Sequence, residues 1–182
     1  MIGTDIPQGF ACQSLDSLYQ KLTDLDVPLF VHASSTDGVG GLKDDRLGQH
    51  NLSLSLGYAQ EETLTVAQLL LGGVLDRHPT LDVCVSHGGG AAAFLAEKMD
   101  QLAQVDPAAS ESVKRNGFGH ELQNLWFDTH VKGEVAAAAL RHYAHEDKLV
   151  FGTNLGGFDT PEALSADAAR LSQNARRLLR MP

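Results

Sequence analysis

The sequence has few cysteines, few basic residues and no long apolar run, and each shortage narrows the kind of protein it can be. Two cysteines, Cys12 and Cys84, are too few for a disulfide scaffold, so we expect a reducing, cytoplasmic setting. The 14 Lys and Arg residues stand against 23 Asp and Glu residues, and the net charge of −9 argues against nucleic acid or an anionic membrane as a partner. No apolar run approaches the ~20 residues of a membrane-spanning helix, and residues 1–5 do not resemble a basic, apolar signal peptide.

The chain does contain enough apolar sequence for a folded core. Its 182 residues correspond to a single domain, for which we take the range 1–182, and 43% of them are hydrophobic against 20% charged. The 18 glycines and 8 histidines are the most informative residues, because glycine permits tight turns and histidine handles protons or metals.

Short apolar runs, each ending in a polar residue, alternate with stretches of helical periodicity. The runs predict buried strands at residues 27–32, 81–87, 124–129 and 148–154. The periodic stretches predict helices at 14–25 (capped by Ser14), 65–77, 92–105, 133–143 and 160–179. This alternation predicts parallel βα units. The polar stretch 33–62 is longer than an ordinary βα connection, so we expect it to serve function.

Two histidines follow predicted strands, where parallel α/β proteins build their sites. His32 suits a metal ion or a proton relay, and a hydrogen-bonded core histidine is the alternative. His87 precedes Gly88-Gly89-Gly90, which lets the backbone turn and approach a ligand, and a helix opening at Ala91 would offer amides to a carboxylate. A tight turn without chemistry is the alternative. An esterase oxyanion loop would also need a Gly-x-Ser-x-Gly pentapeptide, which the sequence lacks.

Other polar residues follow the later predicted strands. Asn154 ends the last predicted strand, and its side-chain amide would be a weak zinc ligand. Asp159 follows five residues later and can reach inward or cap the next helix. Asp128 and His130 come after the third strand, with a cap or loop ion pair as the alternative role.

The remaining histidines and one cysteine point to structural roles. We expect His78 at a helix end, His50 in a loop above the site, and Cys84 packed in the core. We expect the other histidines to lie in solvent or in polar loops: His120, His142 and His145.

Several segments together resemble the amidohydrolase-2 family, which includes aminocarboxymuconate-semialdehyde decarboxylase. They are Pro-Leu-Phe-Val-His at 28–32, Leu-Gly-Gly-Val-Leu-Asp-Arg-His-Pro-Thr-Leu at 71–81, Val-Ser-His-Gly-Gly-Gly at 85–90 and Leu-Val-Phe-Gly-Thr-Asn at 149–154. The resemblance implies a TIM-like (β/α)₈ barrel with a divalent metal, usually zinc, at its C-terminal face. It makes His32 a metal ligand and His87 the acid/base.

The resemblance also assigns the substrate side of the site. It puts Asn154 at a catalytic position that usually holds an aspartate, Gly88 and Gly89 beside the substrate, and Lys98 where relatives bind a substrate carboxylate with arginine.

The sequence departs from the family in two places. It contains no His-x-His pair, and Asn154 replaces an aspartate. Aligned on His32, the chain corresponds to about strands 4–8 of the eight barrel strands, with the fourth strand near residues 1–4. We therefore expect the domain to be incomplete at its N-terminal side.

The family resemblance leads to three functional hypotheses. The first is a metal-dependent decarboxylase or hydrolase that acts on a small carboxylated substrate. The second is a catalytically silent binding or subunit-interaction protein, and the third is a metal-free enzyme that works through His32 and His87. Open sheet edges would favour a homo-oligomer or a complementing subunit.

Overall fold

The computed structural model describes residues 1–34, 44–155, 157, 160 and 167–182. Asp159 and residues 161–166 of the predicted last helix lie outside the described residues. No helix in the described ranges is long and apolar enough to cross a membrane.

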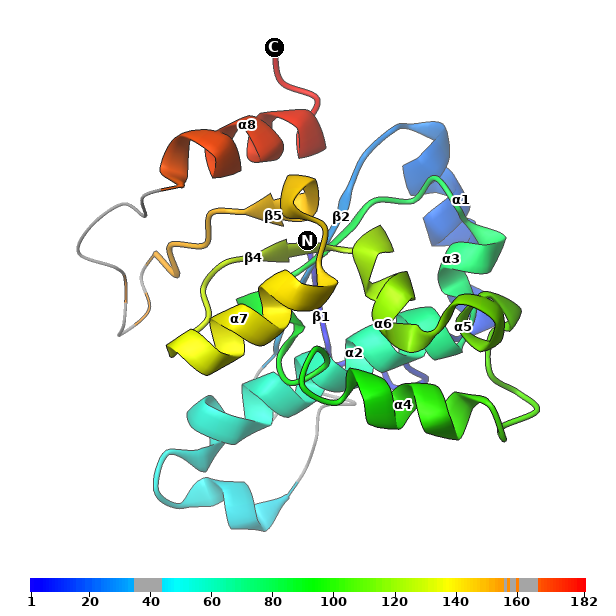
Figure 1. Ribbon diagram of the computed structural model, residues 1–182, viewed down its shortest axis with the longest axis horizontal. Helices are drawn as coiled ribbons and strands as arrows, with labels where there is room; N and C mark the ends of the chain where they lie inside the picture. Colours follow the sequence, from blue (N-terminus) through cyan, green and yellow to red (C-terminus); the bar gives the residue numbers. More distant parts are fainter. Residues whose placement is uncertain (35–43, 156, 158–159, 161–166) are drawn as a thin grey trace.

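Five parallel strands form one sheet in chain order (Figure 1). They are β1 (Ile2–Gly3), β2 (Leu29–His32), β3 (Val83–Val85), β4 (Trp126–Asp128) and β5 (Leu149–Val150). Each strand pairs with the next one in the sequence, so the chain winds in one direction and returns through helices. This is the α/β arrangement of part of a TIM-like barrel, and the predicted fold class is confirmed. The strands β2, β3, β4 and β5 each lie within one of the four predicted apolar runs, whereas β1 lies outside them.

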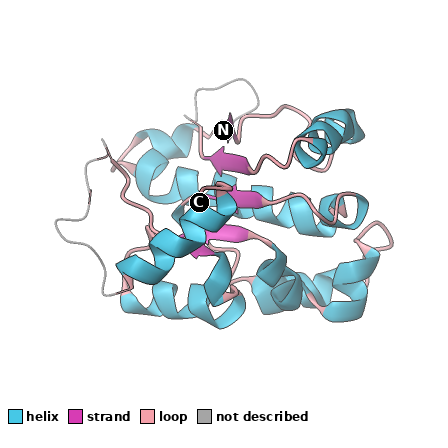
Figure 2. Cartoon of the chain, turned by 90° about the horizontal axis from the view of Figure 1, so that it is seen from above, coloured by secondary structure: helices cyan, strands magenta, loops and turns pink. Residues whose placement is uncertain are grey.

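The helices lie around this sheet (Figure 2). They are α1 (Asp16–Asp24), α2 (Tyr58–Leu71), α3 (Val74–Arg77), α4 (Ala96–Ala103), α5 (Glu111–Asn116), α6 (Phe118–Glu121), α7 (Glu134–Tyr143) and α8 (Ala168–Leu178). Short helical turns occur at Gln13–Leu15, Asp45–Gly48, Ser53–Gly57, His87–Gly89, Leu122–Asn124 and Glu146–Lys148.

Two helix predictions need correction. Ser14 does not cap α1, because it lies inside the turn Gln13–Leu15 and its hydroxyl contacts Gln8 and Cys12. The predicted helix 65–77 is two helices, broken where Gly73 adopts a left-handed φ of 65°, and its first part begins seven residues earlier than predicted. The last residues of the supposed polar connection 33–62 are therefore helical.

Alternation along the strands produces two apolar cores on opposite faces of the sheet. Leu29, Val31, Val83, Val85, Phe127 and Leu149 belong to the larger core, together with most buried helix residues. Cys84, Trp126 and Val150 belong to a smaller core with Leu178 of α8. Cys84 is therefore a packed core residue as predicted, and burial raises the pKa of its thiol.

The C-terminal helix covers part of the edge strand β5. Asn174 of α8 is buried, and its Nδ2 donates hydrogen bonds to the carbonyls of Glu146 (2.9 Å) and Leu149 (2.8 Å). Because the carbonyl of Val150 accepts from Thr129 beyond β4, the carbonyl of Leu149 points away from β4. Within the described residues, β1 and β5 are the outer strands of the sheet as expected, and Asn174 satisfies one carbonyl at the β5 edge.

His78 is the C-cap of α3, so its predicted place at a helix end is confirmed, and its side chain joins that end to α1. The residue is buried, its Nε2 lies 3.2 Å from Asp16 Oδ1, and its ring meets Tyr19 edge-on. The Arg77 guanidinium, hydrogen-bonded to Asp16, holds the pKa of that carboxyl below its usual value, with His78 adding to the effect. These contacts join α1 to α3.

Candidate functional site

Three imidazoles lie in a row at the carboxyl ends of adjacent strands. His32 ends β2, His87 follows β3 and His130 follows β4. The ring centroids of His32 and His87 are 5.0 Å apart, and those of His87 and His130 are 5.5 Å apart. The expectation that strand-terminal residues converge is confirmed for these three, and it follows from the parallel register of β2, β3 and β4.

The central imidazole is held by a buried carboxylate that the sequence-based prediction missed. Glu62 of α2 has 0% exposure, and its Oε1 lies 2.6 Å from His87 Nδ1. The same oxygen accepts a hydrogen bond from the hydroxyl of Ser86 at 2.7 Å. A carboxylate oxygen accepts, so Nδ1 of His87 donates to Glu62, and Nε2 is the ring nitrogen that faces away from this contact. The His87 side chain retains 22% exposure, so the ring is accessible.

The spacing of apolar residues after Glu62 could have predicted that this carboxylate is buried. Glu62 stands four, seven and eight residues before Val66, Leu69 and Leu70, the buried stripe of α2. A carboxylate on the apolar stripe of a helix needs a buried partner, because an isolated buried charge is very costly. The prediction ended the polar connection at residue 62 and therefore assigned Glu62 to a loop.

Backbone contacts fix the ring orientation of His32. Its Nδ1 lies 2.7 Å from the carbonyl of Ala33. Since a carbonyl only accepts, Nδ1 carries the proton and Nε2 has a free lone pair. This tautomer is the one that ligates a metal through Nε2 or accepts a proton there.

The glycine turn after His87 allows close packing between elements. Gly88, Gly89 and Gly90 all have positive φ, from 63° to 72°. A Cβ on Gly88 would lie 2.5 Å from Val131 Cγ2, and one on Gly90 would lie 2.1 Å from the carbonyl oxygen of Ala59. Glycine is therefore required here for packing. The substrate-binding role of Gly88 and Gly89 stays a prediction.

The expected helix N-terminus after this turn is absent. Residues 91–95 form turns and α4 begins only at Ala96. The amides of Gly89, Gly90, Ala91 and Ala92 already donate to Ser86, His87, Thr63 and Gly89, respectively. The amides of Ala91 and Ala92 are therefore already engaged, and carboxylate binding by the amides of Ala93 and Phe94 stays a prediction.

Residues after β4 and β5 pack closely against each other. Asp128 Oδ1 accepts a hydrogen bond from the amide of His130 at 3.0 Å, which is the alternative capping role of Asp128. A Cβ on Gly152 would lie 2.8 Å from Asp128 Cγ and 2.9 Å from His130 Cβ, so the absent side chain leaves room for both residues. Asn154 has a φ of 45°, and its carbonyl accepts from the amide of Gly157. Its catalytic assignment stays a prediction.

The other predicted residues lie on the surface. Lys98 is exposed on α4, which packs against α6, and its role toward a substrate stays a prediction. His50, with a φ of 55°, is exposed in the loop before α2. His120, His142 and His145 are also exposed.

A metal centre needs more ligands than the described residues bring together. Within them, no group of three or more His, Cys, Asp or Glu side chains could hold a metal ion. A structural or catalytic zinc site uses three or four protein ligands. The described part of the chain thus does not fit a complete zinc centre, although His32 has a suitably oriented nitrogen.

A sheet of parallel strands in chain order, with imidazoles at its carboxyl edge, defines an α/β protein built on the (β/α)-barrel plan. A protein-family model described as amidohydrolase matches residues 4–181. The chain belongs to this family, as the resemblance predicted.

Known proteins support the same relationship. The chain is 27% identical over 141 residues to 2-amino-3-carboxymuconate-6-semialdehyde decarboxylase of Dictyostelium discoideum, covering 78% of this chain and 38% of that protein. The crystal structure of apo IDCase from Metarhizium anisopliae matches with a TM-score of 0.72 and 23% identity, covering 98% of this chain and 50% of that one.

A third relative is 5-carboxyvanillate decarboxylase from Novosphingobium aromaticivorans, in complex with manganese and 4-hydroxy-3-methoxy-5-nitrobenzoic acid. It has a TM-score of 0.72 and 17% identity, and the match covers 96% of this chain and 54% of that one. The chain thus spans about half the length of the solved relatives and 38% of the curated one.

Proposed function

We propose that this chain contributes the acid/base part of an amidohydrolase centre that decarboxylates or hydrolyses a small carboxylated substrate. The observation that carries the proposal is the His87–Glu62 pair: a partly accessible imidazole bound at 2.6 Å to a fully buried carboxylate. This pair stands at the carboxyl edge of the sheet, where barrel enzymes carry out their chemistry. The decarboxylases among its relatives support the substrate class.

The pair suits proton transfer. In a decarboxylation, the C–C bond to the carboxylate breaks, CO₂ leaves, and the electron pair stays on the substrate carbon, which then needs a proton. We assign the delivery of that proton to Nε2 of His87, because Nδ1 faces Glu62. Glu62 fixes the ring and stabilises its protonated form, and Ser86 holds the carboxylate in place through its hydroxyl. In a hydrolysis, the same nitrogen would accept a proton from water.

A divalent metal, zinc or manganese, belongs to the proposal for the whole protein, and we assign His32 to it as one ligand. The proton transfer at His87 does not pass through this metal, since the described residues do not complete its site.

The alternative is a catalytically silent member of the family that binds small acids or another subunit. The missing His-x-His pair, Asn154 in place of an aspartate and the lack of a three-ligand set among the described residues favour it.

Turnover and metal content distinguish the two proposals. The purified chain is incubated with 5-carboxyvanillate, with and without added manganese or zinc, and CO₂ release is followed. We expect turnover that His87→Asn abolishes and that His120→Asn, a change at an exposed histidine, leaves intact. Binding without turnover supports the silent alternative, and turnover that survives His87→Asn refutes the acid/base assignment.

Elemental analysis tests the metal assignment separately. We expect metal in the active protein to be lost in His32→Ala, and unchanged metal content in that variant would refute the role of His32.

A further inference from the structure

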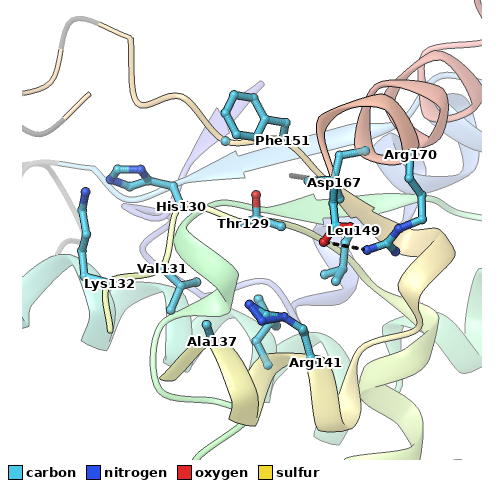
Figure 3. A pocket seen from close by; sticks show the side chains of 13 residues that line it. Thr129, His130, Val131, Lys132, Ala137, Arg141, Leu149, Phe151, Asp167 and Arg170 are labelled. Carbon is cyan, nitrogen blue, oxygen red and sulfur yellow. Dashed lines mark ion pairs between the residues drawn. The ribbon is translucent and has the colours of Figure 1, made fainter. Parts of the chain in front are cut away.

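A separate pocket lies between α7, α8 and the loop that follows β4 (Figure 3). Its volume is about 260 Å³. Its walls come from β5, from residues that follow β4 and β5, and from α7 and α8, whereas His32 and His87 do not line it. Only His130 belongs both to this pocket and to the row of imidazoles.

The floor of the pocket is apolar. Leu140 of α7, Leu149 of β5 and Leu171 of α8 are buried members of the larger core and line the cavity, with Phe151 half-buried beside them. Such a surface accepts an apolar ring or chain, because burying apolar area removes it from water.

The rim of the pocket is cationic. Among the described residues, Lys132, Arg141 and Arg170 line it, with Asp167 as the carboxylate. Arg170 is engaged, because its guanidinium lies 3.4 Å from Asp167 and 3.5 Å from Glu146. Arg141 on the α7 wall makes no ion pair or hydrogen bond with the described residues, and Figure 3 shows it on the wall opposite Arg170.

We propose that this pocket binds a small carboxylate with an apolar body, with Arg141 as the residue that recognises the carboxylate. A guanidinium offers paired N–H donors that match a carboxylate, and the leucines accept the apolar end. The volume lies below the ~300–1,000 Å³ of pockets for drug-sized ligands, which limits the ligand to about one aromatic ring. The hydroxyl of Thr129, the residue after β4, adds a polar group to the lining of the pocket.

This site does not rest on the proposed catalytic function. Its ligand would contact His130, whose ring meets His87, so an occupied pocket would adjoin the row of imidazoles without using the proton-transfer pair.

Benzoate is the probe, titrated into the whole chain by isothermal titration calorimetry. We expect binding that weakens roughly tenfold or more in Arg141→Gln. Arg115→Gln, the same change at an exposed arginine of α5, is the matched control and should bind like the unmodified chain. Benzamide, the neutral analogue of benzoate, should bind as weakly as benzoate binds to Arg141→Gln.

A second pair of variants tests the cavity itself. Ala137→Leu fills the pocket from α7, and Ala138→Leu makes the same change at an exposed neighbour outside the pocket. We expect only Ala137→Leu to abolish benzoate binding, with helix content by circular dichroism unchanged in both.

Comparison with the catalytic pair separates the two proposals. Binding to this pocket should persist in His87→Asn, which abolishes the proposed turnover. Absence of benzoate binding, binding unaffected by Arg141→Gln and Ala137→Leu, or binding lost in His87→Asn would each overturn the pocket assignment.

Discussion

Replacing Gly90 with alanine tests whether the turn after His87 is required for packing. Gly90 has a φ of 64° and a ψ of −124°, a combination open essentially only to glycine, which costs an L-residue roughly 1–3 kcal/mol. The new Cβ would also lie 2.1 Å from the carbonyl oxygen of Ala59 and 2.7 Å from Thr63 Oγ1, both on α2. Because a backbone atom of a packed helix must move, overpacking adds roughly 1–3 kcal/mol.

The two costs together predict a loss of roughly 2–6 kcal/mol of unfolding free energy for Gly90→Ala. A chain of this size loses roughly 2–4 °C of melting temperature per kcal/mol, so the midpoint of thermal unfolding should fall by roughly 4–24 °C. The assay is urea and thermal unfolding followed by circular dichroism.

Two other glycines separate the contributions to this loss. Gly133 has a φ of 92° and a ψ of 144°, but no atom lies within 4 Å of the place its Cβ would take, so Gly133→Ala should cost only the roughly 1–3 kcal/mol of backbone strain. Gly48 has neither a positive φ nor a close neighbour, and its replacement should change stability by under about 1 kcal/mol. If Gly90→Ala costs no more than Gly133→Ala, α2 does not pack on the turn as described and the reasoning is refuted.

Three further predictions concern other contacts. Glu62→Gln should lower turnover by roughly 10–100-fold, and Ser86→Ala by less; equal activity of Glu62→Gln and the unmodified chain would contradict the pairing with His87. Asn174→Ala should cost roughly 1–3 kcal/mol in urea unfolding, because two carbonyls lose their donor, whereas the exposed Gln173→Ala should be neutral. Arg77 lowers the pKa of Asp16 below its ordinary 3.8 in the folded chain, so the ionised carboxylate stabilises the fold above pH 3.8, and this stabilisation is lost as the pH falls through the lowered pKa. The difference in unfolding free energy between the unmodified chain and Asp16→Asn should therefore be present at pH 7 and shrink as the pH falls across that range. A difference that grows there would contradict the pairing.

Local sequence was sufficient for the strands and for the residues at their ends. Residues 29–32 and 83–85 alternate between two apolar faces, and this alternation needs only the period of the strand. Because parallel strands share one direction, His32, His87 and His130 had to emerge at one edge once the strands were recognised.

Helix ends were less well predicted, because capping depends on neighbours outside the helix. Ser14 has the right residue type for an N-cap, yet its hydroxyl contacts Gln8 and Cys12. The helix expected from Ala91 begins only at Ala96, and the amide of Ala91 donates to Thr63 of α2 instead of opening the helix.

The sequence by itself determined the family, the parallel βα order and the identity of the strand-terminal histidines, because these depend on local periodicity and motif. Tertiary structure alone decided that Glu62 meets His87 across 25 positions of chain, and that Asn174 covers the edge of β5. Both contacts depend on how a helix packs against the sheet, and the packing of α2 and α8 is set by the shape of the whole core rather than by any nearby residue.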